Sequence, residues 1–486
     1  MRGKHTDGMS NKVRNEREVI DDYSLNRVPE EQKKSGWALS WLSMGIVSTL
    51  VQLLIGSYVA AVAGMKLAIL ADVVVAIFGG TLGWLVANVS FREGLSSTVT
   101  SRFYGFGARG SVITSGIFGF MILGFLALEN ALLYFGTLFA LGWSDTIFHA
   151  VLIFGILTVV WIVLTTYGVN QVMKVSSYLL IAFLVLLAYI FYIAAFASGT
   201  PFSTIINHPA LIPNMGSPLT RLGIAITTLA GSAGALALVD ADYARYAKTK
   251  RDIPIMAYAG SIMMDIVTMI VGSVIVFGAT GPVISYFMAQ GFSSTAAQAK
   301  AQAMAQYNTG AYFIVLSSIA GFLLMYAAQA KAQVLNTYSG SLALVNFFDV
   351  VFKRRPGRLA MVILGNVVAL IMIAVGILGF IASWLNVLGI ITTSFAAVMI
   401  ADYYIVRHSN RADYSSVETV NIAGVISITV ATFLGTYMEN TGIFPLGFLA
   451  ALFIVIILYP VLRTKIFTPG AHVKYIKGTM AISEEE

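Results

Sequence analysis

A short polar run inside an apolar segment is the clearest sign of chemistry in this sequence. Residues 326–340 read YAAQAKAQVLNTYSG and follow the largely apolar run FIVLSSIAGFLLM. On a helix, Gln329, Gln333 and Asn336 share one face, because residues three or four positions apart lie together. Lys331 lies nearly opposite that face. A helix that is polar on two faces cannot lie against lipid, so we expect this segment inside a helix bundle.

Lys331 has two interpretations. Its ammonium either reaches the inner interface along an extended stem, or belongs to a buried site. About nine residues, roughly 13 Å at 1.5 Å per residue, separate it from Gly340 at the predicted helix end, which is far for a lysine stem. Its alanine neighbours allow close helix approach. We therefore favour a site over snorkelling or a purely structural ion pair.

A carboxylate of opposite charge lies on another predicted helix. Glu129 stands in GFLALENALLYFG, near the middle of the third apolar segment. A charge at the bilayer centre costs about 2.5–3.5 kcal/mol on insertion scales, so such residues are candidates for function. Two opposite charges on separate helices indicate a shared polar cavity, although Glu129 could instead be a structural partner of Lys331 or of a hydroxyl. Asp72 and Asp265 are equally compatible with structural roles.

The composition requires that these residues sit in a membrane. Of 486 residues, 58% are hydrophobic and 11% charged, with a mean hydropathy of +0.82. Soluble domains carry about 25% charged residues. The chain has no cysteine, which excludes a disulfide framework and thiolate metal sites. We expect no cofactor and no metal site. The net charge of +7 does not indicate a nucleic-acid partner, because the basic residues follow the loops between the apolar segments.

Apolar segments of about 20 residues suffice to cross a bilayer, and the sequence predicts twelve of them. They are expected near residues 37–64, 67–90, 110–140, 147–168, 174–198, 221–240, 254–280, 311–340, 359–377, 380–405, 419–437 and 443–463. The external connection 281–310 is expected to carry a small amphipathic helix.

The basic residues orient these spans. Of the 30 lysines and arginines, 26 fall in the two tails and alternate loops, and only Lys66, Arg221 and Lys300 fall on the other side. This positive-inside bias predicts a multi-pass protein of the cell membrane with both termini in the cytoplasm. The polar N-terminal tail lacks the apolar core of a signal peptide and is expected near anionic lipid.

Glycines predict interruptions in two spans. The first contains SMGIVSTL around Gly45, and the sixth contains AGSAGALALVDADYARY with Gly231, Ser232 and Gly234. Glycine costs roughly 1 kcal/mol relative to alanine in a helix. Interrupted helices at corresponding positions of two halves mark midplane binding sites in transporters. We therefore expect both helices to be broken beside a substrate site.

Three runs resemble motifs of the nucleobase–cation symporter family, the purine, cytosine, allantoin and hydantoin permeases. GSAGALALVDADYARYAKTKRDI is similar to the end of that family's sixth helix, with Asp242, Tyr243, Arg245 and Tyr246 in its D-(F/Y)-x-R-(F/Y) pattern. SFAAVMIADYYIVRHSNRADY resembles the end of its tenth helix, and STVTSRFYGFGARGS its loop before helix three. The three runs fall in order across most of the chain.

The resemblance implies an all-α integral membrane fold of the leucine-transporter type, with a five-plus-five inverted repeat plus two extra helices. The expected divisions are an N-terminal cytoplasmic tail 1–36, a first repeat 37–198, a second repeat 221–405, two further helices 419–463 and a C-terminal cytoplasmic tail 464–486.

The resemblance also implies where a substrate lies, between helices one, three, six, eight and ten. Phe125 takes the family's stacking position and Glu129 its glutamine position, where a carboxylate could accept two hydrogen bonds from an N–H/NH₂ edge or pair with a cation. A second stacking aromatic of the family falls near Ala233, a departure that puts a sandwiched base in doubt or suggests a bulkier substrate. The expected substrate-binding residues are Phe125, Glu129, Gly231, Ser232, Ala233, Gln333 and Asn336.

The family's sodium site lies between helices one and eight. Its helix-one positions match Gly45 and Ser48, but its hydroxyl pair on helix eight matches Lys331 and Ala332, which have no hydroxyl. Lysine has three donors and no acceptor, so it cannot ligate sodium. We expect its ammonium in the cation site and transport without sodium. Burial favours the neutral amine, so a proton is the natural coupling ion, carried by Lys331 or Glu129; exchange or uniport is the fallback.

These patterns favour a permease that imports a nucleobase-like heterocycle by alternating access, proton-coupled and sodium-independent. An amino-acid or amine transporter of the same fold is the alternative, with Glu129 as the cation's partner. A membrane enzyme is disfavoured because the five histidines are scattered, with no His/Asp pair at motif spacing. A receptor is disfavoured because no cytoplasmic signalling domain is evident.

Overall fold

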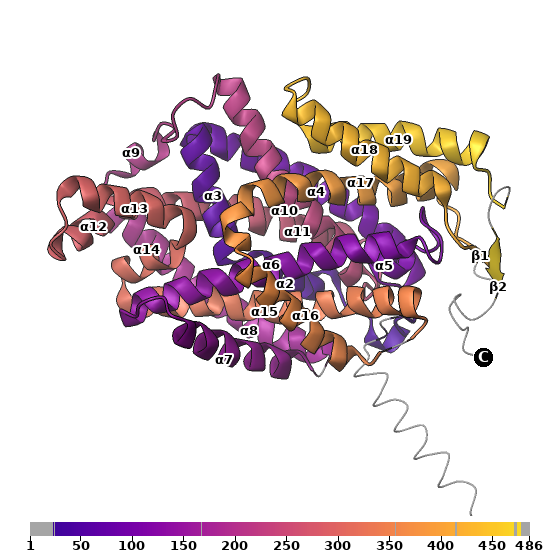
Figure 1. Cartoon of the computed structure of the whole chain (residues 1–486), viewed down its shortest axis with the longest axis horizontal. Helices are drawn as coiled ribbons and strands as arrows, with labels where there is room; N and C mark the ends of the chain where they lie inside the picture. Colours follow the sequence, from indigo (N-terminus) through magenta and orange to yellow (C-terminus); the bar gives the residue numbers. More distant parts are fainter. Residues whose placement is uncertain are drawn as a thin grey trace, which may run out of the picture.

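The computed structural model describes residue 23 and residues 25–477, apart from 167, 355, 414–415 and 471–473. The two predicted tails therefore lie partly outside the described residues, which exclude 1–22, 24 and 478–486. Figure 1 shows long helices side by side, with α12 and α13 at one end of the molecule and β1 and β2 at the opposite end.

The described chain is helical apart from one small sheet. The first half comprises η1 Glu30–Gln32, α2 Gly36–Val47, α3 Leu50–Ala63, α4 Met65–Glu93, α5 Ser97–Thr100, α6 Ser111–Leu141, α7 Ile147–Thr165, α8 Gly168–Tyr192, η2 Ile193–Ala197 and α9 Phe202–Ile206. The second half comprises α10 Pro218–Ala244, α11 Asp252–Ser261, η3 Ile262–Met269, α12 Ile270–Ala289, α13 Ser294–Tyr307, α14 Thr309–Leu316, α15 Ser318–Phe352, α16 Arg358–Ala374, η4 Ile377–Phe380, α17 Ile381–Ile400, η5 Ala401–Val406, β1 Ser416–Glu418, α18 Ile422–Asn440, α19 Gly447–Val461, η6 Leu462–Ile466 and β2 Tyr475–Lys477.

Each of the twelve predicted spans falls on helix, but not all meet the requirements for crossing a bilayer. Nine helices of the described residues are long and apolar enough, and the bent pair α2–α3 makes a tenth. Of the remaining two, α15 carries the polar run and α16 has only 17 residues. The chain is a multi-pass membrane protein, and the count of twelve spans stays a prediction.

Burial separates the helices that form the core from those that face lipid. In α10 and in η4–α17–η5, 83% of the apolar window is buried, against 17% in α7. α10 packs on α4 and α17, and α6 packs on α15. Because a bilayer offers apolar surroundings, α7 can leave most of its apolar side chains outside the protein. The polar residues of α15, Gln329, Lys331, Gln333 and Asn336, are buried in the protein interior.

The first predicted span is broken, as expected, but three residues after Gly45. α2 ends at Val47, α3 begins at Leu50, and the helix axis bends by 64° between them. Ser48 has φ −86° and ψ 70°, and the Thr49 side chain accepts a hydrogen bond from the Gln52 amide, 3.2 Å away. The break thus ends one half-helix and caps the next at mid-span.

The predicted break in the sixth span is wrong. α10 is a continuous α-helix from Pro218 to Ala244, through Gly231, Ser232 and Gly234. These glycines serve helix packing instead. A Cβ on Gly231 would collide with the Leu385 carbonyl of α17, and one on Gly234 with the Thr392 hydroxyl. The small residues therefore let α10 and α17 approach closely.

The eighth predicted span also differs in its limits. A break at Ser317 separates α14 from α15, and α15 runs on to Phe352. The expected amphipathic helix of the external connection is α13, which buries Ala297 and Ala301 and exposes Gln298 and Gln302.

A small sheet joins segments from distant parts of the chain. β1 and β2 pair antiparallel, with Val417 opposite Ile476. The loop before α6 binds the same segment, because the amide of Ala108 donates to the Glu418 carbonyl over 2.8 Å. The motif around residues 105–110 is thereby fixed to the segment that leads into α18.

We predict that Gly231→Ala destabilises the protein by about 1–3 kcal/mol, because the added methyl group must push α10 away from α17. Thermal unfolding of the detergent-solubilised protein measures this loss. Gly155→Ala on exposed α7 is the matched control, since nothing lies within 4 Å of its new Cβ. Equal effects of the two substitutions would contradict the packing role of Gly231.

Candidate functional site

The ammonium of Lys331 lies in the break of the first span. Its Nζ donates to the carbonyl oxygen of Ser48, and to that of Ala328 at 3.0 Å. It also lies over the Phe183 ring, 4.2 Å from the centroid. The last carbonyls of a helix lack partners inside the helix and carry partial negative charge. A buried cation is therefore held where α2 ends.

The side chain of Lys331 ends between the broken first span and α8. Lys331 is fully buried, and Ser48 supplies a carbonyl from the break. Gly45 lies one turn earlier, where a Cβ would collide with the hydroxyl of Ser176. The two helix-one positions expected at a cation site thus lie on the side of α2 that faces α15 and α8.

The opposite face of α15 is bound to α6. Gln329 Nε2 donates to the Glu129 carbonyl over 2.7 Å, and Gln333 Nε2 donates to Asn130 Oδ1 over 2.7 Å and to the Leu126 carbonyl over 2.9 Å. Gln329 Oε1 also accepts, at 3.4 Å, from the amide of Leu50 at the start of α3. The two glutamines therefore join helices, and their hydrogen bonds are committed to the protein.

A small cavity lies between α2, α3, α6, α10, η3 and α15. Its volume is about 30 Å³, which is room for one or two water molecules. Its polar lining consists of Gln52, Glu129, Ser232 and Asn336, with the ring of Phe125 beside them. A planar heterocycle would enter this cavity only if the lining helices moved apart.

Glu129 connects the cavity with the helix break. Its carboxylate accepts from the Thr49 hydroxyl and, at 3.3 Å, from Asn336 Nδ2. It also attracts the ammonium of Lys331. Both groups that reach this carboxylate are donors, so its oxygens act as acceptors.

Four of the seven expected substrate residues line this cavity and three do not. Phe125, Glu129, Ser232 and Asn336 line it. Gly231 faces α17, Ala233 contacts Gly79 of α4, and Gln333 is bonded to α6.

Trp384 of α17 lies beside Phe125 and was not expected from the sequence. Its ring lies 4.9 Å from that of Phe125 at an interplanar angle of 79°, an edge-to-face geometry favoured by aromatic pairs. The indole N–H is buried without a hydrogen-bond partner in the described chain. A tryptophan in ASWLN, at the start of a buried helix, was the available signal, but that helix carries no ionisable residue to mark it as part of a site.

The other buried carboxylates lie apart from the cavity lining. Asp72 of α4 and Asp265 of η3 are near enough to repel each other, and Asp240 accepts from the Ser43 hydroxyl over 2.6 Å. They belong to the interface of α2, α4, α10 and η3.

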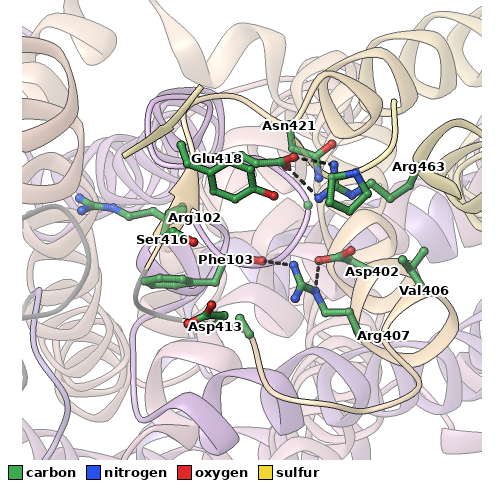
Figure 2. Close-up of a pocket in the computed structure, with 16 residues that line it drawn as sticks. Arg102, Phe103, Asp402, Val406, Arg407, Asp413, Ser416, Glu418, Asn421 and Arg463 are labelled. Carbon is green, nitrogen blue, oxygen red and sulfur yellow. Dashed lines mark hydrogen bonds and ion pairs between the residues drawn. The ribbon is translucent and has the colours of Figure 1, made fainter. Parts of the chain in front are cut away.

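A larger polar cavity lies at the end of the molecule that carries β1 and β2. Its volume is about 380 Å³. Figure 2 shows two ion pairs among its charged side chains: Arg407 with Asp402 at 3.0 Å, and Arg463 with Glu418 at 2.8 Å. Two of the motif runs that carried the family resemblance meet here, from the loop before α6 and from η5.

The third motif run also has structural partners. Asp242 accepts from the amide and the hydroxyl of Ser97, both at 2.7 Å. Arg245 donates to the Tyr338 hydroxyl at 3.0 Å and to the Tyr23 carbonyl at 2.8 Å. These residues fasten the end of α10 to α5, α15 and the N-terminal segment.

Comparison with solved structures identifies the fold. The chain is similar to Mhp1, a nucleobase-cation-symport-1 family transporter, in a closed conformation with bromovinylhydantoin bound: TM-score 0.69, 16% identity, covering 90% of this chain and 93% of that one. The inward-facing conformation of Mhp1 gives a TM-score of 0.67 at 17% identity, covering 90% and 92%. A Na⁺-coupled sialic acid symporter in a substrate-bound outward-open state gives 0.60 at 14% identity, covering 92% and 93%.

These likenesses confirm the resemblance at the level of the fold. The described chain has the all-α membrane fold shared by Mhp1 and the sialic acid symporter. No protein-family model and no curated protein matches the sequence.

We predict that Glu418→Gln and Arg463→Met each destabilise the protein by about 3 kcal/mol, because each leaves one buried charge without its partner. The double variant should lose less than the sum of the two, since residues in contact couple. Thermal unfolding of the four proteins measures the coupling. Lys465→Met, at an exposed neighbour, is the control. Strictly additive losses would contradict the pairing.

Proposed function

We propose that this protein is a secondary transporter that imports a nucleobase-like heterocycle by alternating access, without sodium and coupled to protons. The single observation that carries the proposal is the ammonium of Lys331 in the break of the first span. The protein's fold is similar to that of Mhp1, whose structure has bromovinylhydantoin bound, and this similarity supports a heterocyclic substrate.

Sodium independence follows from the chemistry of lysine. The Ser48 carbonyl, an oxygen that could ligate sodium, instead accepts a hydrogen bond from Nζ. A second cation placed there would meet the ammonium at close range and repel it. The Na⁺-coupled sialic acid symporter shows that sodium coupling occurs in this fold, so the lysine marks a difference in coupling.

The position of Lys331 also suggests how a proton acts on transport. The lysine lies on α15, which packs on α6, whereas its acceptor Ser48 lies on the broken helix, which packs with α10, α11 and η3. Loss of the proton removes the attraction between the two groups of helices. We therefore place the coupling proton on Lys331 or Glu129, whose charges attract each other.

In the proposed cycle, substrate enters from outside and lies between Phe125, Glu129, Ser232 and Asn336. The bundle of α2–α3, α4, α10 and α11–α12 then rocks against α6 and α15, and the cavity opens to the inside. Both termini are taken as cytoplasmic, in accord with the basic residues of the loops.

An amino-acid or amine transporter of the same fold is the second candidate. The carboxylate of Glu129 in the cavity lining favours it, because it could pair with an ammonium. Competition between heterocycles, amino acids and amines for binding separates the two.

We predict that nucleobase-like ligands raise the unfolding temperature equally in sodium and in choline, but differently at mildly acidic and mildly alkaline pH. Ligand binding to the folded state stabilises it by mass action, so the shift reports affinity. The screen contains nucleobases, related heterocycles, amino acids and amines. A response only in sodium would contradict the assignment of Lys331, and a response only to amino acids or amines would favour the second candidate.

A designed pair of substitutions should make substrate binding depend on sodium. Lys331→Ser with Ala332→Thr supplies two hydroxyl oxygens beside the Ser48 carbonyl, so substrate binding should become sodium-dependent and lose its pH dependence. Lys300→Met, on exposed α13, is the control and should leave both unchanged. If substrate binding to the double variant is unaffected by sodium and still depends on pH, the coupling ion does not act at Lys331.

A further inference from the structure

A second cavity, much larger than the central one, lies beside the second half of the broken span. We call it the α13 cavity; α3, α12, α13, α14 and the segment that follows α9 form its lining. Its volume is about 480 Å³, within the range of about 300–1,000 Å³ that is usual for small-molecule sites. Among the described residues the two cavities share no lining residue, so they are separate.

Hydrogen bonds fix the segments that form the α13 cavity. The amides of Leu211 and Ile212 both donate to the Ala61 carbonyl near the end of α3, over 2.7 and 3.1 Å. The Tyr312 hydroxyl of α14 donates to the Ala301 carbonyl of α13 over 2.8 Å. The walls are therefore in place without a ligand, and binding does not have to order them, which favours affinity.

One part of the lining is a pair of stacked rings. The His208 ring lies flat on that of Phe277, with centroids 4.4 Å apart and an interplanar angle of 5°. His208 Nδ1 lies 2.8 Å from the Pro209 carbonyl. Because a carbonyl only accepts, Nδ1 carries the hydrogen, and Nε2 keeps the lone pair in the neutral ring. The histidine is thus held in one orientation and offers Nε2 as an acceptor.

The other polar groups of the lining are uncharged. Tyr58 brings a hydroxyl that makes no hydrogen bond within the described residues, and Gln298 and Gln302 bring exposed side-chain amides. The described lining contains no carboxylate, ammonium or guanidinium group. An ionised ligand would lose hydration here without gaining an ionic partner. The α13 cavity therefore favours a neutral molecule.

We propose that the α13 cavity is a second binding site for a neutral heterocycle. The class of ligand rests on the proposed function, whereas the site rests on the cavity itself. The faces of a flat ring can contact apolar side chains of the lining such as Val276 and Ala305. Its polar edge can bond to Tyr58, His208 or the glutamine amides. Because α3 also lines the central cavity through Gln52, the bound heterocycle contacts the half-helix that begins at the break.

The chain has no cysteine, so an introduced thiol can be labelled alone. Gln302→Cys places a thiol in the lining, and Ala303→Cys places one on the same helix outside it. In the purified full-length protein, saturating cytosine or adenine should slow maleimide labelling of the first thiol by at least about threefold, because an occupied cavity excludes the reagent. The second thiol should react as before. Leucine and ethylamine, which are ionised, should slow neither reaction.

A bulky substitution then separates the two cavities. Ala305→Phe fills part of the α13 cavity, and Ala303→Phe is the matched control on an exposed position of the same helix. Equilibrium dialysis with tritiated cytosine and with tritiated adenine counts the molecules bound at saturation. The number per protein should fall from about two in the wild type to about one in Ala305→Phe, because the central cavity still binds, and the control should keep both.

Each outcome decides for or against the second site. Equal slowing at both thiols indicates a general change of shape and contradicts it. A single bound molecule that Ala305→Phe retains also contradicts it, while leaving the heterocycle transporter intact. A single bound molecule that Ala305→Phe loses supports the α13 site and overturns the central cavity as the substrate site. Binding of neither compound overturns both proposals. If Ala305→Phe does not fold, the two cysteine variants still decide.

Discussion

The structure depends on one buried charge, the ammonium of Lys331, and on the helix break that receives it. An isolated ammonium in an apolar interior is costly. Here the carbonyls of Ser48 and Ala328, the face of the Phe183 ring and the attraction of Glu129 recover part of that cost. Because one of these carbonyls belongs to the end of α2, the lysine and the interruption of the first span stabilise each other.

The polar run that follows Lys331 extends this constraint to neighbouring helices. Gln329 and Gln333 bind α6, and Gln329 also reaches the first amide of α3. Glu129 accepts from Thr49 across the same junction. A chain of hydrogen bonds thus joins α3, α6 and α15 around the small cavity. Any ligand that widens the cavity must act on this chain of hydrogen bonds.

The sequence predicted much of this arrangement because membrane helices leave few choices. Long apolar segments predicted the helices, and the polar faces of the run with Lys331 predicted a buried helix. The position of Lys331 opposite Gly45 and Ser48 came from the family resemblance. Composition could not predict the role of Gly231 and Gly234, since glycine both interrupts helices and lets them pack closely. In α10 packing prevails, and the expected break is absent. Trp384 and Gln52 were missed because their places in the site follow from tertiary packing and from the cap at Thr49.

We propose that the ammonium of Lys331 takes the place that a sodium ion has in sodium-coupled relatives of this fold. Equilibrium binding of radioactive sodium to the purified, full-length protein tests it most directly, with choline as the competing control. We expect no saturable sodium binding, whether or not a heterocycle is bound. A saturable site that appears in the wild-type protein would contradict it and would return Lys331 to a structural role.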